Sequence, residues 1–403
     1  MTALSTIIDR RYDDRYVRDV LVRLASAPTD VPLGQFEIDP TDPKIHHFVH
    51  DIVKPELERL GVGRIEADEL NNLVCRIGTG GPPTLLLMTY TTAQHGNYTT
   101  PEMEGRIANG RAYGFDEDCV FGKGTSQCKG AMASALGALK ILEDERMRLT
   151  GTLIFVVNAE SQSSHRCSIR IIDGHQIRAD HGIVAIGCPL ITLGNRGRVD
   201  IVVTVQGQVA HSSQPQLGKN AIWGAYEALG RIRALHQGLT RSHPRLGREQ
   251  VEPYRLVLSP IAPHTIPDTA CFTLDRRLLP GADVDGAVEE VRRALADLGP
   301  YDVRVEKSVH HLPAEVPPDA PIVKALTDAY RAVTGAPPEV GYVGYTFDAG
   351  YACAQGIPTV MFGPTFHAGR VHGSEIVATE FVPLSQVRTF AKVYAHAIMS
   401  LLR

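Results

Sequence analysis

The chain lacks the features that would assign it a partner or compartment from composition alone. Its seven cysteines are scattered singly, with no Cys-x-x-Cys pair, so neither a disulfide framework nor a structural zinc site is indicated. The net charge of -4 and the pI near 6.5 give no basic field for nucleic acid or an anionic membrane. No apolar run is long enough to span a bilayer, and residues 1–18 contain no apolar signal core. We therefore expect a cytoplasmic, thiol-reduced protein.

The composition that remains is typical of a globular chain, with 43% hydrophobic and 21% charged residues. A chain of 403 residues is too long for one compact core, so we predict two domains. Helical periodicity marks residues 15–27, 44–60 and 131–143. Short apolar runs suited to buried strands are found at residues 73–77, 84–88, 152–157 and 182–186. Helices that alternate with such strands predict an α/β fold.

From residue 194 onward the patterns predict a second unit. Its elements follow the order β-α-β-β-α-β, which is typical of a ferredoxin-like domain. In chain order they lie at residues 198–205, 220–235, 254–259, 270–275, 284–298 and 301–305. We therefore predict a ferredoxin-like domain at residues 194–307, inserted into a discontinuous α/β domain made of residues 1–193 and 308–403.

Several motifs together point to one enzyme family. They are residues 122–130 (GKGTSQCKG), 207–213 (GQVAHSS), 275–281 (DRRLLPG), 346–349 (TFDA) and 372–375 (HGSE). This combination resembles the dinuclear zinc aminoacylase/carboxypeptidase family, which includes acetylornithine deacetylase, succinyl-diaminopimelate desuccinylase and glutamate carboxypeptidase. The resemblance extends from about residue 73 to the end of the chain.

The resemblance implies a zinc-exopeptidase-like catalytic domain with an inserted lid and dimerisation domain, and therefore a homodimer. In the family, the residue that matches His211 reaches the substrate's oxyanion in the partner subunit's site. The residue that matches Arg277 binds the substrate carboxylate, a task that suits a planar, bidentate guanidinium. The implied partner is a small-molecule substrate that carries a carboxylate.

The metal-ligand positions depart from the family pattern. Thr89 stands where the family has a His ligand, and Thr91 where it has the Asp that orients this ligand. Gln127 replaces the Asp that bridges the two metals, Ser161 replaces a Glu ligand, and Cys188 replaces the next carboxylate. Four of the five ligands have changed, and a catalytic zinc ion needs about three protein ligands. We therefore predict that the chain holds no metal and no other cofactor.

At the metal centre two family positions are retained, the terminal ligand His372 and the general base Glu160. With no cation nearby, burial would favour the neutral form of the Glu160 carboxyl group and suit it to acid–base catalysis. We predict a catalytic set and a substrate-binding set. The catalytic set comprises Glu160, His211, His372 and Gln127, and the substrate-binding set comprises Arg277, Thr89, Thr91 and Cys188.

The leading interpretation is an amidohydrolase-like or peptidase-like enzyme without the two metals, which cleaves or transfers an acyl group. One alternative is a catalytically inactive binding or regulatory homologue, in which Glu160 is a plain carboxylate at a strand end. Another is a zinc hydrolase whose metal site has been rebuilt by His95 and residues 115–119. Cys188 could also act as a nucleophile with His372 as its base, although a lone cysteine at a strand end is more often a packing residue.

Overall fold

The computed structural model places most of the chain in two compact units. The residues that it describes are 3–32, 35, 37–92, 103–145, 148–160, 164–364, 371–372, 375–376 and 380–403. The first unit comprises Met1–Leu193, Val316–Gly341 and Tyr351–Arg403, and the second comprises Gly194–Glu315 and Tyr342–Gly350. Among the described residues, no helix combines the length and apolar character needed to cross a membrane.

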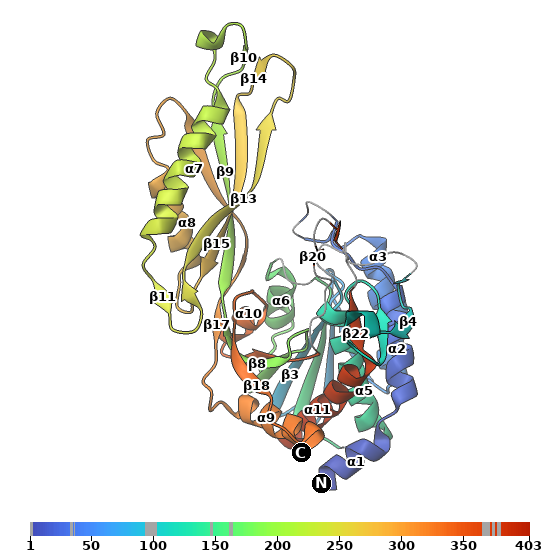
Figure 1. Ribbon diagram of the computed structural model, residues 1–403. Helices are drawn as coiled ribbons and strands as arrows, with labels where there is room; N and C mark the ends of the chain where they lie inside the picture. Colours follow the sequence, from blue (N-terminus) through green and yellow to red (C-terminus); the bar gives the residue numbers. More distant parts are fainter. Residues whose placement is uncertain are drawn as a thin grey trace. The chain divides into compact units, whose positions relative to one another are not determined.

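A six-stranded mixed sheet of order β1-β2-β6-β3-β7-β19 forms the centre of the first unit (Figure 1). Its strands are β1 (Ile65–Ala67), β2 (Leu73–Gly78), β3 (Thr84–Tyr90), β6 (Thr152–Asn158), β7 (His181–Val184) and β19 (Thr359–Met361). β3 runs parallel to β6 and β7, and β19 runs parallel to β7, whereas β2 is antiparallel to β6. The runs predicted at residues 73–77, 84–88 and 152–157 are therefore strands, buried as their near-continuous apolar sequences require.

Helices cover this sheet. The predicted helix at residues 131–143 is α5 (Gly130–Asp144), whose small and apolar side chains are buried along almost its whole length. The pattern at residues 44–60 gives one helical run in three parts, α3 (Pro43–His46), a π-helical turn η1 (His47–Val53) and α4 (Lys54–Arg59). The other helices are α1 (Ala3–Arg11), α2 (Asp14–Ser26), α6 (Arg166–Ile169), α9 (Pro321–Thr334), α10 (Ala349–Ala354) and α11 (Leu384–Leu402).

Short strands add small sheets to both units. β4 (Ile107–Asn109), β5 (Asp118–Phe121) and β22 (Phe381–Pro383) form a three-stranded sheet of order β22-β5-β4. The remaining short elements are β8 (Leu190–Asn195), β17 (Ala314–Glu315), β18 (Glu339–Val343), β20 (Val371–His372), β21 (Glu375–Ile376), and the short helical turns η3 (Arg111–Tyr113), η4 (Thr125–Lys129), η5 (Arg170–Gly174) and η6 (Pro215–Leu217). Most of these strands have only two to four residues, too few to show an alternating pattern.

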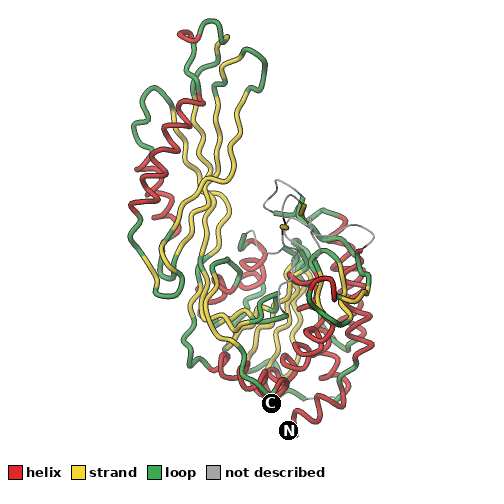
Figure 2. Tube along the Cα trace, in the orientation of Figure 1, coloured by secondary structure: helices red, strands yellow, loops and turns green. Residues whose placement is uncertain are grey.

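The second unit has the ferredoxin-like order that its sequence predicts. Its strands are β9 (Gly197–Gln206), β13 (Gln250–Ser259), β15 (Thr269–Leu278) and β16 (Asp302–His311), and its helices are α7 (Ala221–Gly238) and α8 (Val284–Ala294). The antiparallel sheet has the order β13-β15-β9-β16, and both helices pack on one face of it (Figure 2). Three short strand pairs or bridges extend from this unit, namely β10 (Ala210–His211) with β14 (Thr265–Ile266), β11 (Ser242–His243) with β12 (Gly247–Arg248), and Gln208 with Lys219.

Candidate functional site

The parallel strands of the first unit bring five of the predicted site positions to one edge of the sheet. Thr89 and Thr91 lie at the carboxyl end of β3, Glu160 follows β6, and Cys188 follows β7. The loop that contains Gln127 is attached to the same edge, because the Gly187 N–H donates to the Gln127 carbonyl oxygen at 2.8 Å. Ligand sites of open α/β sheets lie at this edge.

The side chains at the changed ligand positions do not fit a metal ion. The Thr89 hydroxyl donates to the Val156 carbonyl oxygen at 3.0 Å, and the Thr91 hydroxyl donates to that of Ala159 at 2.7 Å. The Cys188 thiol is fully buried and contacts the Leu190 carbonyl oxygen at 3.4 Å. Divalent metals at such sites require carboxylate, imidazole or thiolate donors. These two hydroxyl groups and this thiol instead donate to main-chain carbonyl groups.

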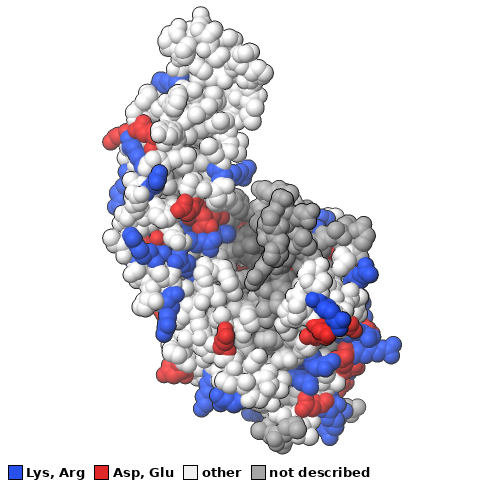
Figure 3. Space-filling model, viewed as in Figure 1, with Lys and Arg blue, Asp and Glu red and all other residues white. Residues whose placement is uncertain are grey.

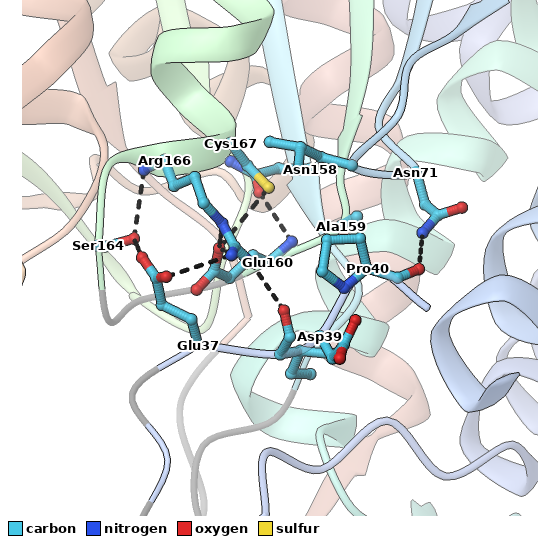
Figure 4. A network of polar contacts seen from close by, with 12 residues as sticks. Glu37, Asp39, Pro40, Asn71, Asn158, Ala159, Glu160, Ser164, Arg166 and Cys167 are labelled. Atoms are coloured by element: carbon cyan, nitrogen blue, oxygen red, sulfur yellow. Dashed lines mark hydrogen bonds and ion pairs between the residues drawn. The ribbon is translucent and has the colours of Figure 1, made fainter. Parts of the chain in front are cut away.

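Glu160 has a cationic neighbour that the sequence interpretation did not include. Its carboxylate is 3% exposed, and Oε2 contacts the Nε and Nη2 atoms of Arg166, both at 2.9 Å. Arg166 also lies 3.2 Å from Glu37 Oε2, so its guanidinium group lies between two carboxylates (Figure 4). The expectation that no cation lies near Glu160 is therefore wrong.

Further hydrogen bonds fix this network in place. Arg166 Nη2 donates to the Ile38 carbonyl oxygen at 2.7 Å, and the Ser164 hydroxyl donates to Glu37 Oε1 at 2.5 Å. The Glu160 N–H donates to the side-chain oxygen of Asn158 at 3.1 Å (Figure 4). Because main chain and side chains both anchor the guanidinium and the carboxylate, their relative position is set by the fold.

A second carboxylate, Glu380, holds the Gly-rich loop. It is fully buried before β22 and accepts hydrogen bonds from the N–H groups of Gly124, Ser126 and Gln127 at 2.8–3.0 Å, and from the Ser126 hydroxyl at 3.1 Å. Burial raises the pKa of Glu380, while these hydrogen bonds act in the opposite direction. The loop that carries an Asp in the family is thus shaped here by a carboxylate from about 250 residues further along the chain.

The other three predicted site residues, His372, His211 and Arg277, lie on β20, β10 and β15. His372 belongs to β20, where its backbone pairs with Glu375, and its side chain is outside the described residues. His211 is exposed on β10 of the second unit, with Nδ1 2.8 Å from the Ser213 hydroxyl. Arg277 lies on β15, where Nε and Nη2 contact the two carboxylate oxygens of Asp275 at 2.7 and 2.8 Å. The structure thus gives each of them a location, and the roles of all three stay predictions.

In the loop at residues 115–119, which was one candidate for a rebuilt metal site, the acidic side chains bind other groups of the protein. The Asp116 carboxylate is bound by the Arg111 guanidinium at 2.7 and 2.8 Å, and Glu117 accepts from the Ser385 N–H and hydroxyl. Cys119 packs in an apolar cluster with Phe121 and Phe381. Burial raises the pKa of the Cys119 thiol to about 12, so it is a poor metal ligand. His95, the other predicted member of this site, lies outside the described residues.

Sequence reasoning did not identify Arg166, Glu37 or Glu380. Arg166 comes only six residues after Glu160, so the sequence could have indicated that a cation lies near this carboxylate. Glu37 and Glu380 reach their partners over more than 120 and 250 residues of chain, and no local spacing reveals such contacts.

Comparison with known proteins identifies the class. Residues 102–400 match the model of Peptidase family M20/M25/M40. The uncharacterized protein YgeY of Escherichia coli (strain K12) is 28% identical over 339 residues, which cover 77% of this chain and 80% of the relative. Succinyl-diaminopimelate desuccinylase of Maricaulis maris (strain MCS10) is 23% identical over 365 residues, which cover 86% of this chain and 89% of the relative.

Solved structures share the fold. An M20 family metallo-carboxypeptidase, Sso-CP2 from Sulfolobus solfataricus, superimposes with a TM-score of 0.75 at 15% identity, covering 95% of this chain and 98% of that chain. Human carnosine dipeptidase 1 gives a TM-score of 0.71 at 14% identity, covering 99% of each chain. The chain belongs to Peptidase family M20/M25/M40. This membership makes it a relative of peptidases and amidohydrolases, enzymes that act on amide bonds.

Proposed function

We propose that this chain is an enzyme that acts without the family's two metals on an amide or related acyl bond of a small, carboxylate-bearing amino-acid derivative. The observation that carries the proposal is the chemistry of the sheet edge. Thr89 and Cys188 occupy ligand positions and Thr91 replaces the Asp that orients a ligand. All three direct their donors to main-chain carbonyl groups, while Glu160 is buried beside Arg166. The names of relatives that remove succinyl or acetyl groups support an N-acyl amino acid as the substrate class.

In this proposal, Glu160 takes a proton from the attacking nucleophile and delivers it to the departing amine, as a general base and then a general acid. Arg166 holds the carboxylate in position through its two contacts. His211 stabilises the oxyanion and Arg277 anchors the substrate carboxylate. The nucleophile is water in hydrolysis or a second substrate in acyl transfer. This scheme favours acyl transfer over hydrolysis, because it contains no metal-activated water to act as the nucleophile.

Metal analysis combined with an activity assay tests the proposal. We expect purified protein to contain no stoichiometric zinc, cobalt or manganese and to keep its turnover of N-acyl amino acids after chelation. About two metal ions per chain, together with activity lost to chelator and restored by metal, would overturn it. If metal is found, the pair His311 and Asp348, whose ligand atoms lie within 4.8 Å of each other in the second unit, is the first place to mutate.

We also propose that the second unit mediates a homodimer. Trp223 and Tyr226 of α7 are 65% and 73% exposed, and Leu256 on the edge strand β13 is 52% exposed. An exposed apolar helix face beside an unpaired strand edge suits association across a two-fold axis. In Figure 3 the end of this unit that carries β10 and β14 shows almost no charged side chains. Such a surface would suit the proposed contact of His211 with a partner's site.

Light scattering measures this association directly. We expect the wild-type chain to be a dimer, and the double variant Trp223→Ser/Tyr226→Ser to shift towards monomer because it removes two exposed aromatic anchors. A matched control is Ile261→Ser, which changes another highly exposed apolar residue outside α7. A monomeric wild-type chain at assay concentration would count against the proposal.

A further inference from the structure

A pocket of about 460 Å³ opens within the second unit and is lined mainly by basic and aromatic side chains. Its walls come from the residue between β8 and β9, from the start of β13, from β15, from the β11–β12 hairpin, and from the end of β18 with the segment that follows it. The lining residues are Arg196, Arg245, Leu246, Gln250, Arg277, Tyr342, Gly344 and Tyr345. Three arginines and no acidic residue line this space, so its electrostatic character is positive.

The three guanidinium groups are compensated very differently. Arg277 is paired in bidentate fashion with Asp275. Arg196 donates from Nη1 to the Gln250 side-chain oxygen at 3.1 Å and from Nη2 to the Leu246 carbonyl oxygen, both of which are neutral acceptors. Within the described part of the chain, neither Arg196 nor Arg245 forms an ion pair with a carboxylate. The pocket therefore carries about two positive charges that the protein itself does not balance.

Burial makes the Arg196 charge costly. This residue is only 8% exposed, and desolvation together with the nearby Arg277 lowers its pKa. A buried guanidinium group held by neutral acceptors alone is destabilising unless an anion joins it. The carboxylate of Glu315 is bound to Tyr342 and His243, and in the part of the chain that the structure describes it forms no ion pair with these arginines. An anionic ligand is the missing partner that this arrangement suits.

We propose that this pocket binds a ligand with two negative charges, a dicarboxylate or a phosphate monoester, through Arg196 and Arg245 in addition to Arg277. The inference rests on the proposed function only in taking Arg277 as the residue that binds the substrate carboxylate, and it adds a second anionic group to the substrate. Arg245 sits on the exposed β11–β12 hairpin, so it can meet a second anionic group that a ligand projects from the pocket. Two unbalanced guanidinium groups on separate elements favour two separated charges over one.

Calorimetric titration of the full chain tests this inference without turnover. The probes are glutarate with two carboxylates, phenyl phosphate with a dianionic phosphate, and butyrate with a single charge. We expect glutarate or phenyl phosphate to bind at least about tenfold more tightly than butyrate, because each charge-assisted contact adds roughly this factor. Which of the two dianions binds more tightly identifies the source of the second charge.

Variants assign the effect to the pocket. Arg245→Ala should remove about tenfold of the preference for the dianion while leaving butyrate binding nearly unchanged. Arg196→Lys retains the charge but loses the planar fork and should weaken both classes of ligand. The control is Arg233→Ala on α7, an exposed arginine outside the pocket lining, which should change neither.

Three results would overturn the inference: equal affinity for butyrate and the dianions, no binding of either dianion, or an Arg245→Ala variant with unchanged glutarate affinity. The same titrations on Glu160→Gln protein keep the inference separate from the proposed function. If that variant retains full turnover, the catalytic proposal fails while the binding result stands. If binding fails while Glu160→Gln is inactive, only the dianion inference fails.

Discussion

The two units of the molecule differ in how their arginine side chains are paired with carboxylates. In the first unit, one guanidinium group is shared by two carboxylates, because Arg166 contacts both Glu160 and Glu37. In the second unit, three guanidinium groups line one pocket, and among the described residues only Arg277 of these three has a carboxylate partner. The first arrangement has its charges paired within the protein, whereas the second leaves room for an anion from outside. This difference agrees with our proposal, in which proton transfer belongs to the first unit and substrate anchoring to the second.

The second unit also contains an internal comparison. Arg276, next to Arg277 on β15, is fully buried and bound by two carboxylates, Glu249 at 2.7 Å and Glu290 at 2.8 Å. Arg196 is almost as buried but has only neutral acceptors. In our proposal, Arg276 therefore stabilises the fold, whereas Arg196 takes part in binding an anion.

The largest effect that we predict belongs to the first unit. Glu160→Gln retains shape and hydrogen bonding but removes proton transfer, so kcat should fall about 10²–10⁴-fold. Substrate binding should survive because Arg277 carries the carboxylate contact. A steady-state assay on a panel of N-succinyl and N-acetyl amino acids measures both quantities.

Glu37→Gln is the matched control for that variant, since it changes the other carboxylate on Arg166. It should lower kcat much less, because Glu37 only positions the guanidinium. Wild-type turnover by Glu160→Gln would mean that the site is misplaced, and Cys188→Ser would be tested next. Ligand binding by a wild-type chain that turns over no substrate would instead favour the inactive binding homologue.

The next largest effect concerns Arg276. Arg276→Met leaves Glu249 and Glu290 with only the half-exposed Arg241 as a shared cation, so the free energy of unfolding should fall by about 3–5 kcal/mol. Arg196→Met removes a charge that lacks a carboxylate partner and should cost much less in the absence of an anion. Urea titration followed by fluorescence of Trp223, the only tryptophan, reports on the unit that contains both arginines. Equal losses in the two variants would remove the distinction between them.

The sequence predicts most of the fold because its periodic segments are long. The ferredoxin-like order follows from strands of ten residues such as β9 and β15, whose alternation is clear, and from helices of eleven or more residues. The β22-β5-β4 sheet could not be predicted, because strands of three or four residues show no period and pair across more than 250 residues. Local pattern is informative only where an element spans several of its own repeats.

The site was predictable to a similar degree. Motif positions located Glu160, Gln127, Thr89, Thr91 and Cys188, and the structure brings these segments to one sheet edge. Arg166 could have been noticed six residues after Glu160, but its ion pair with Glu37 could not be predicted, because Glu37 reaches it across a long stretch of chain. Likewise, the three-arginine pocket gathers residues from β13, β15 and a hairpin, whose proximity only the fold establishes. Residue identity was readable from the sequence, whereas electrostatic balance was not.

The smallest effect that we predict is a pH dependence in the second unit. Asp200 on β9 is 1% exposed, and burial, aided by Asp275 on the neighbouring strand, raises its pKa from 3.8 to about 6. The ionised form is therefore disfavoured in the folded state. Since the unfolded chain releases this proton near pH 3.8 and the folded chain only near 6, stability falls as pH rises across that window. The loss is complete above about pH 6 and amounts to at most about 3 kcal/mol, because one pKa unit corresponds to about 1.4 kcal/mol.

Asp200→Asn removes this titration, so the variant should be more stable than wild type at pH 7 by up to about 3 kcal/mol, and the advantage should vanish near pH 4. Trp223 fluorescence during urea unfolding at pH 4, 5, 6 and 7 measures the difference. The control is Asp285→Asn, since Asp285 is exposed and paired with Lys307, which lowers its pKa. That variant should gain no stability as pH rises. A difference for Asp200→Asn that is constant from pH 4 to 7 would show that the raised pKa does not contribute to the stability of this unit.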